Sequence, residues 1–311
     1  MLDSLAIQRR LVQDKIAEMT AVASAIDETS RNIKAKDQID WNNLLNIIHL
    51  TTNNKRIEIQ YRNATNIAAR IRLHRDFSTN PQPWFKWIFQ QIQLKSNMQI
   101  LKLSCGNGEL WKENLALLPP NIEVTLSDIS EGMLQDAKKN LGANSSFDYQ
   151  IIDINNFPTI TQKYDLIIAN HTLFYSDQVE KVVHKISQFL RPSGYLVAST
   201  YSQKYMHEIT DLVQEFNKEI YLSDKKLYEI FGLANGKKIL TPYFSSINLI
   251  HYPDRIKITQ PSPLINYILS CHGNQNQLLL DHYQEFYDYV NNKISSGFTI
   301  TKDAGLFIAK K

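Results

Sequence analysis

The sequence predicts an α/β fold in which helices cover both faces of a parallel sheet, preceded by a helical N-terminal region. Short apolar runs alternate with helical segments through the central part of the chain, which is the pattern of a buried parallel sheet. The runs expected as strands are Gln99–Leu103, Ile122–Leu126, Tyr149–Asp153, Tyr164–Ala169 and Tyr195–Thr200. Two later runs, 243–259 and 298–309, are expected to add an antiparallel pair at the edge of that sheet.

The composition is that of an ordinary globular protein. Of the 311 residues, 43% are hydrophobic, and 34 basic side chains against 31 acidic ones leave a net charge of only +3. This charge is too small to indicate nucleic acid or an anionic membrane as a partner. Two cysteines make neither a disulfide framework nor a metal site, and no signal or membrane-spanning segment is seen, so we expect a cytoplasmic, metal-free protein.

The N-terminal third is expected to be helical. Apolar residues within residues 1–30 recur at steps of three and four, which predicts one amphipathic helix with a coiled-coil pattern. This helix could pack on its own core or join two chains as a homodimer, and both alternatives stay open. Residues 31–95 are expected to form a helical lid or linker, followed by a core over residues 96–311. The basic stretch 55–75 is more typical of a solvated helix than of a nucleic-acid site.

One stretch combines a strand, a turn, a helix, a second strand and an acid in an order that indicates ligand binding. The turn contains Gly106 and Gly108, where missing side chains let a ligand approach the backbone at a helix N-terminus. Asp128 ends the next strand, where a carboxylate can accept hydrogen bonds from both ribose hydroxyls. Trp111 stands where a dinucleotide fingerprint needs Gly or Ala, so the pattern favours a different adenosine-containing ligand.

Three stretches together resemble class I S-adenosylmethionine-dependent methyltransferases. Leu101–Gly108 resembles their first motif, which typically reads Leu-Glu/Asp-Leu-Gly-Cys-Gly-Thr-Gly. Leu126–Leu134 resembles their ribose-binding segment, and Tyr164–His171 with Leu190–Tyr195 resembles their fourth strand and the turn before the fifth. The resemblance implies a Rossmann-like sheet, S-adenosyl-L-methionine as the cofactor, and in-line methyl transfer to an oxygen or nitrogen of a small-molecule acceptor.

The same resemblance implies a set of cofactor-binding residues, with Asp153 and Ile154 beside the adenine and Ile129 on its other face. The full set comprises Ser104, Gly106, Gly108, Asp128, Ile129, Asp153, Ile154 and Asn170.

His171 follows the fourth strand and is the candidate catalytic residue. It could act as a general base, or it could only position the acceptor or cap the next helix. Four further residues, Tyr175, Tyr201, His74 and Trp84, are candidates to bind the acceptor or to cover it as a lid, with simple core packing as the alternative for each.

Two residues depart from the family pattern: Lys102 replaces the motif acid and Ser104 replaces the first glycine. Lys102 is expected either to face the positively charged methionine end of the cofactor or to pair with Asp165 or Glu123. These departures motivate an alternative function, a non-catalytic ligand-sensing or scaffolding dimer with a degenerate methyltransferase fold.

Residues 2–87 also resemble the C-terminal tail of MerR-type regulators that carry a methyltransferase domain. This resemblance implies a lid and a dimer rather than control of transcription.

Overall fold

The computed structural model describes residues 65–159, 161–223, 225–271, 273–279 and 281–311. Nearer the N-terminus it describes only positions 9, 12, 13, 16 and 20, all of them helical. The amphipathic seam expected within residues 1–30, the dimer that it would form and the segment 31–64 therefore lie outside the described residues. None of the helices in the described part is both long and apolar enough to cross a membrane.

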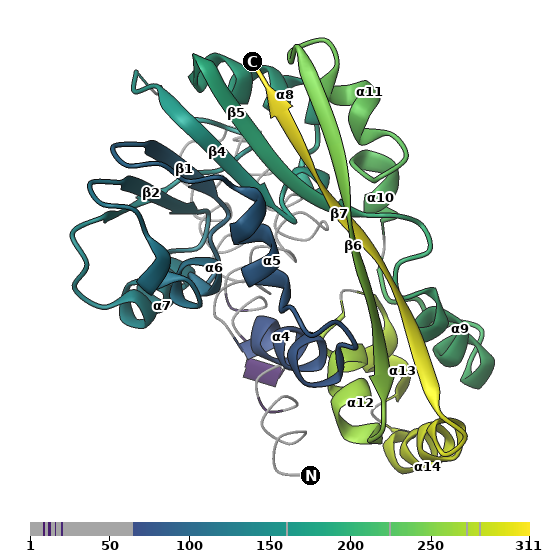
Figure 1. The fold of residues 1–311 in the computed structure, drawn as a ribbon. Coiled ribbons are helices and arrows are strands. Elements are labelled where there is room, and N and C mark those ends of the chain that lie inside the picture. The colour runs from purple at the N-terminus through teal and green to yellow at the C-terminus, as the bar shows by residue number, and fades with distance from the viewer. Residues whose placement is uncertain are drawn as a thin grey trace, which may run out of the picture.

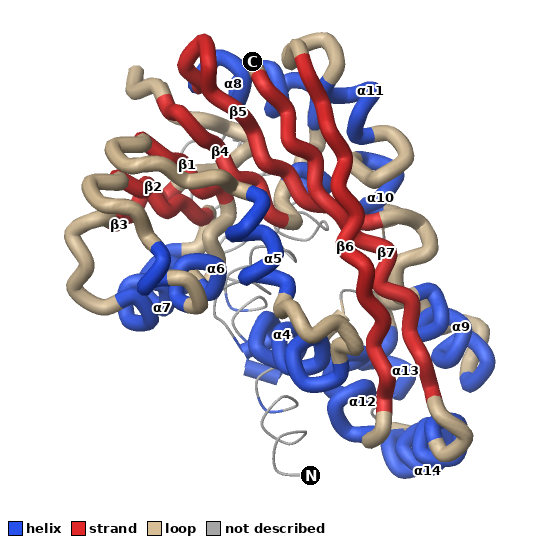
Figure 2. The backbone as a smooth tube through the Cα atoms, in the orientation of Figure 1, coloured by secondary structure: helices blue, strands red, loops and turns tan. Residues whose placement is uncertain are grey.

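The core is a seven-stranded sheet with the strand order β3-β2-β1-β4-β5-β7-β6 (Figures 1 and 2). The strands are β1 (Gln99–Leu103), β2 (Glu123–Asp128), β3 (Phe147–Ile151), β4 (Tyr164–Asn170), β5 (Leu190–Tyr201), β6 (Ser246–Ile258) and β7 (Phe298–Lys310). The first five strands pair in parallel, whereas β7 runs antiparallel to both β5 and β6. This topology confirms the predicted fold class and the antiparallel edge.

The strand β3 begins and ends two residues earlier than the apolar run at 149–153 predicts. Phe147 is buried and packs its ring edge-on against Trp111 at 5.8 Å, which extends the strand backward. The Asp153 carboxylate accepts the backbone N–H of Asn155 at 2.8 Å, which turns the chain out of the sheet. Asp153 therefore lies in a turn after β3.

Successive residues of a strand point to opposite faces of the sheet, and helices cover both faces. On one side Ile100 packs in a core with α5 (Trp84–Gln91), α6 (Glu109–Lys112) and the end of α7 (Glu131–Leu141). On the other side Leu101 packs with α8 (Val179–Phe189), α10 (Leu227–Ile230) and α11 (Gly236–Leu240). The short 3-10 turns η1 (Leu115–Leu117) and η2 (Leu173–Tyr175) complete this part of the fold.

A second lobe forms where β6 and β7 extend past the sheet, as Figure 1 shows. It contains α4 (Thr65–Phe77), α9 (His207–Phe216), α12 (Pro261–Leu269), α13 (Gln275–Leu279) and α14 (Tyr283–Ile294). Its apolar core joins Leu73 of α4 to Ile256 of β6, Ile265 of α12 and Phe286 of α14. The helix α4 is thus packed on elements from the last quarter of the chain.

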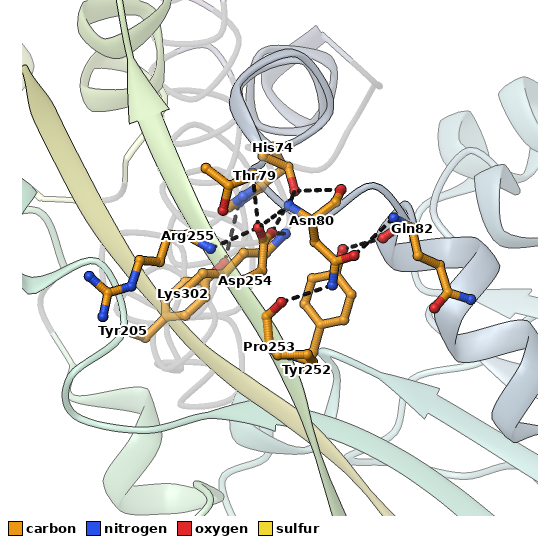
Figure 3. A network of polar contacts seen from close by, with 11 residues as sticks. His74, Thr79, Asn80, Gln82, Tyr205, Tyr252, Pro253, Asp254, Arg255 and Lys302 are labelled. Atoms are coloured by element: carbon orange, nitrogen blue, oxygen red, sulfur yellow. Dashed lines mark hydrogen bonds and ion pairs between the residues drawn. The ribbon is translucent and has the colours of Figure 1, made fainter.

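A buried ion pair joins the two long strands to the connector between α4 and α5 (Figure 3). Lys302 Nζ of β7 lies 3.0 Å from Asp254 Oδ2 of β6, and their side chains are 4% and 0% exposed. Asp254 also accepts hydrogen bonds from the Ser78 hydroxyl at 2.8 Å and from the backbone N–H of Asn80 at 3.0 Å. Both oxygens of the carboxylate are therefore used, and the connector is fixed to β6.

Two further bonds fix the same connector just before α5. The Asn80 side-chain amide donates to Pro253 O at 2.8 Å, and the Tyr252 hydroxyl donates to Gln82 O at 2.5 Å. Because α5 begins at Trp84, these bonds determine where that indole lies.

Replacing Asp254 by alanine is expected to lower the free energy of unfolding by about 3–5 kcal/mol, because Lys302 would remain buried without its counter-ion. The exposed pair Arg75–Asp76, with side chains 63% and 40% exposed, provides the control, and Asp76→Ala should cost less than about 1 kcal/mol. Urea denaturation of the two variants and the wild type measures both values. Equal losses in the two variants would show that the buried pair has no special role.

Candidate cofactor and acceptor site

The turn after β1 has the backbone conformation that its glycines permit. Gly106 and Gly108 have φ values of +55° and +79°. A Cβ on Gly108 would lie 3.2 Å from Leu141 Cδ1 and 3.3 Å from Ala137 Cβ, so this glycine is also required by the packing of α7. The sequence predicted that both glycines let a ligand approach the backbone. For Gly108 the packing of α7 is a second reason why the residue is glycine.

Asp128 links the turn to the end of β2. Its carboxylate accepts the Gly106 N–H at 2.9 Å and the Ser130 N–H at 3.0 Å, and the residue is 6% exposed. Burial raises the pKa of Asp128, and the hydrogen bonds from Ser130 and Gly106 partly oppose that rise. The next residue, Ile129, is 42% exposed and presents an apolar surface beside the carboxylate.

Lys102 lies beneath the same turn and is only 2% exposed. Its ammonium donates to Leu103 O at 2.5 Å and to Ser104 O at 2.8 Å, while burial lowers its pKa to about 8. Ser104 occupies the left-handed region with φ of 47°, where a glycine would carry less strain. The two departures from the family pattern are thus in direct contact.

Neither acid expected to pair with Lys102 does so. Asp165 instead accepts from the Arg191 guanidinium at 2.7 Å and from the Gln99 N–H at 2.8 Å, and Glu123 is exposed at the start of β2. Those alternatives for Lys102 are therefore wrong.

The residues expected near the adenine are placed beyond the end of β3. Ile154 is buried with 8% exposure, and Asp153 is half-buried in the turn that follows the strand. Asp153 also pairs with Asn156 in a single antiparallel β-bridge.

The carboxyl ends of β4 and β5 are tied together by one serine. The Ser199 hydroxyl donates to Asn170 Oδ1 and accepts the backbone N–H of His171 at 3.0 Å. His171 is held in the left-handed region with φ of 49°. Such backbone strain is typical of residues whose position matters to a site.

The His171 ring belongs to an aromatic cluster at the carboxyl ends of β4 and β5. Its ring stacks on Trp84 with centroids 5.3 Å apart, and it lies 6.1 Å from the ring of Tyr201 and 5.9 Å from that of Phe174. Burial lowers the pKa of His171 to about 3, assisted by the charges of Lys302 and Lys102. The imidazole is therefore neutral near pH 7 and a weak base, which favours the positioning role over proton abstraction.

The cluster continues from the sheet to the second lobe. Tyr201 stacks on Tyr205 at 4.8 Å, and the Tyr205 hydroxyl is 3.3 Å from His74 Nε2. His74 Nδ1 is buried without a hydrogen-bond partner among the described residues, and the ring also meets Tyr267 edge-on at 6.1 Å. The candidate acceptor residues Trp84, Tyr201 and His74 are thus linked through His171 and Tyr205 into one network of contacts.

Tyr175, the fourth candidate, is connected to His171 through Phe174. Its ring contacts Phe174 edge-on at 4.7 Å, and Phe174 in turn contacts His171.

Sequence reasoning missed Ser199, Tyr205 and Lys302. Ser199 and Tyr205 flank the end of β5, where site residues gather in such sheets, so their positions carried a usable signal. Lys302 carried none, because its place beside Trp84 depends on the register between β6 and β7, which the predicted pairing of the two strands does not specify.

Comparison with known proteins supports this interpretation of the chain. Residues 94–247 match a family model described as "Methyltransferase domain". A malonyl-[acyl-carrier protein] O-methyltransferase of Acetivibrio thermocellus is 32% identical over 153 residues, which are 48% of this chain and 51% of that protein. Malonyl-[acyl-carrier protein] O-methyltransferase 1 of Ilyobacter polytropus is 28% identical over 143 residues, which are 45% of this chain and 53% of that protein. The chain thus spans about half the length of these curated relatives.

The fold comparison agrees with the sequence comparison. A crystal structure of a candidate methyltransferase from Bacillus halodurans matches with a TM-score of 0.50 and 13% identity, covering 73% of this chain and 98% of that one. The YcgJ protein of Bacillus subtilis matches with a TM-score of 0.50 and 12% identity, covering 73% and 97%. Taken with the family match, the sheet order and the Asp128 turn identify residues 94–247 as a methyltransferase domain with the class I fold.

Proposed function

We propose that the chain is an S-adenosylmethionine-dependent methyltransferase that acts on a small-molecule acceptor. The observation that carries the proposal is the Asp128 carboxylate, which bonds to the Gly106 N–H and stands beside the exposed Ile129. The match of residues 94–247 to a methyltransferase domain supports it, as do relatives whose names describe O-methyltransferases.

The residues present fit the nucleoside half of this cofactor. The Asp128 carboxylate has about four acceptor positions, and the backbone N–H groups of Gly106, Ser130 and Ile129 use three of them, so one remains for a ribose hydroxyl. Ile129 offers apolar surface that a flat base would cover.

Lys102 places a cation beneath the turn at the position where the family pattern has an acid. Lys102 directs its ammonium at the carbonyls of Leu103 and Ser104, so it fixes the turn and adds positive charge beneath it. This observation favours a second candidate function, a ligand-sensing or scaffolding protein that binds without turnover. Calorimetry with S-adenosylmethionine followed by a turnover assay separates the two, because only the methyltransferase releases S-adenosylhomocysteine.

The bound cofactor would supply an electrophilic methyl group. Asp128 would orient the ribose, while the bonds from Ser199 to Asn170 and His171 hold the ends of β4 and β5. The aromatic cluster would exclude water and align the acceptor with the methyl group. This alignment would supply most of the rate acceleration in a transfer that needs no proton acceptor.

We also propose the division into residues 1–30, 31–95 and 96–311, a cytoplasmic location and a homodimer joined by the N-terminal helix. Sedimentation equilibrium of the intact protein should then give twice the 36.0 kDa mass of one chain. Deleting residues 1–30 should return the mass to that of a monomer. A monomeric intact protein would remove the dimer from the proposal.

Asp128→Ala is expected to weaken S-adenosylmethionine binding by about 10- to 100-fold, because a charged acceptor of hydroxyl donors is lost from a buried site. Asp148→Ala is the matched control, since Asp148 is an exposed carboxylate on the neighbouring strand β3. Isothermal titration calorimetry measures both affinities, and circular dichroism checks that both variants fold. Unchanged affinity in folded Asp128→Ala would remove this residue from the ribose site.

Lys102→Met is expected to change how stability depends on pH. The Lys102 pKa is about 8 in the folded chain and about 10.4 in the unfolded chain, so between these values the unfolded state binds the extra proton. The wild type should therefore gain stability over the variant as pH rises through this window, by on the order of 3 kcal/mol. Urea denaturation at pH values of about 7.5, 9 and 10.5, which bracket the window, measures the difference. Parallel curves would show that Lys102 is not buried as a cation.

A further inference from the structure

His74 has one ring nitrogen that the fold leaves without a hydrogen bond. The residue lies in the last turn of α4, and its Nε2 is 3.3 Å from the Tyr205 hydroxyl (Figure 3). Its Nδ1 is buried and has no partner within the described residues. Because buried polar groups in folded proteins are almost always hydrogen-bonded, this nitrogen indicates that a partner from outside the chain is missing.

Hydrogen-bond accounting places the proton of the His74 ring on Nδ1. Burial raises the pKa of Tyr205, so its hydroxyl stays protonated and can donate. When it donates to Nε2, that nitrogen is the acceptor of the ring and Nδ1 carries the proton. In the opposite arrangement, with Nε2 as donor, the Tyr205 proton and the Nδ1 lone pair would both lack a partner in the described part of the chain. The first arrangement leaves fewer polar groups unsatisfied and is therefore favoured.

The His74 ring is also neutral, so Nδ1–H is its one free donor. Burial lowers the pKa of His74 well below its usual value, and the charge of Lys302 acts in the same direction. The imidazolium, which would donate from both nitrogens, is thus absent near neutral pH. A group that binds at Nδ1 must consequently accept a hydrogen bond.

The rings that contact His74 give this N–H no acceptor. Tyr267 meets the imidazole edge-on at 6.1 Å, and its hydroxyl donates to Met206 Sδ at 3.3 Å. The Tyr205 ring lies 6.3 Å away and directs its hydroxyl at Nε2. An ordered water needs two to four polar partners, and these aromatic and thioether neighbours do not provide them.

His74 is connected to the proposed methyl-transfer site through two tyrosine rings. Tyr205 stacks on Tyr201 with centroids 4.8 Å apart, and Tyr201 is 6.1 Å from the ring of His171. His171 directly follows β4, at the end of the sheet where the cofactor is proposed to bind. A group at Nδ1 would therefore belong to the part of the acceptor that extends toward the second lobe.

We propose that His74 Nδ1–H binds an oxygen of the methyl acceptor that accepts a hydrogen bond without donating one, such as a carbonyl or an ether oxygen. The inference rests on the proposed function. Tyr205 is a positioning residue, because its hydroxyl keeps the proton of His74 on Nδ1. An ammonium in place of this oxygen would set donor against donor and leave the Nδ1 proton unpaired.

The first experiment measures which nitrogen of His74 carries the proton. Nitrogen-15 NMR of the intact, histidine-labelled protein distinguishes the two tautomers, and the spectrum of His74→Asn assigns the signals. We expect Nδ1–H in the wild type and a shift toward Nε2–H in Tyr205→Phe. The same change in Tyr267→Phe should leave the tautomer unaltered, since the Tyr267 hydroxyl bonds to Met206. A wild-type ring with the proton on Nε2 would overturn the proposal.

The second experiment measures whether an acceptor-only oxygen binds at this nitrogen. Acetophenone and ethylbenzene are matched in shape and differ by the carbonyl, whereas 1-phenylethylamine carries an ammonium instead. Acetophenone should shift the Nδ1 signal and bind about 3- to 10-fold more tightly than ethylbenzene, as one neutral hydrogen bond permits. The amine should bind no better than ethylbenzene. Equal affinity for acetophenone and ethylbenzene, or an unmoved Nδ1 signal, would contradict the inference.

Two variants of His74 separate the donor from simple packing. The amide nitrogen of asparagine lies close to the position of Nδ1, and that of glutamine lies close to the position of Nε2. His74→Asn should therefore retain the preference for acetophenone, and His74→Gln should lose it. Loss of the preference in both variants, or in neither, would show that the Nδ1–H does not make the contact.

A turnover assay distinguishes failure of this inference from failure of the proposed function. The intact protein is incubated with methyl-tritiated S-adenosylmethionine and the small-molecule fraction of a cell extract. Labelled products together with equal binding of acetophenone and ethylbenzene refute the role of His74 but keep the methyltransferase. No labelled product in any fraction refutes the proposed function, and with it the statement that the bound oxygen belongs to a methyl acceptor.

Discussion

The ion pair between Asp254 and Lys302 is the contact on which the arrangement of the site depends. A buried pair stabilises a fold only when further hydrogen bonds satisfy its remaining atoms, and here Ser78 and Asn80 supply them from a distant, earlier segment of the chain. The same contacts that neutralise the carboxylate therefore attach the α4–α5 connector to β6. Trp84 follows this connector and is held against His171 as a result.

Lys102 and Ser104 are best understood as one change rather than two. A serine at a positive φ costs on the order of 1–2 kcal/mol relative to glycine. The Lys102 ammonium donates to the carbonyls of Leu103 and Ser104 and so holds the turn in this conformation, although burial disfavours the charge. The turn thus keeps the geometry that presents the Gly106 N–H to Asp128. The consequence is a cation where the family pattern places an anion.

The local patterns of the sequence were sufficient for the order and type of the strands, and they selected the turn and the acid on which the proposed cofactor site rests. Apolar periodicity located the strands, and the glycine turn with the acid at the end of the next strand located Asp128. The limits of β3 were missed because an aromatic contact from Phe147 to Trp111 and an Asx turn at Asp153 decide them. Lys302 was missed because the sequence predicted that the last two strands pair but not the register that sets Lys302 opposite Asp254, nor the contact of the α4–α5 connector with β6.

Burial and nearby charge together limit the proton chemistry available to His171, the candidate catalytic residue. Burial lowers the pKa of His171 to about 3, with the charges of Lys302 and Lys102 as smaller causes, so the imidazole is neutral and a weak base. Its strained backbone is nevertheless retained by the bond to Ser199, and its ring is retained by Trp84. In the proposed reaction, a residue held in this way would contribute shape and orientation rather than accept a proton. In-line methyl transfer can be accelerated by positioning alone, so a firmly held ring could serve the proposed reaction without taking up a proton.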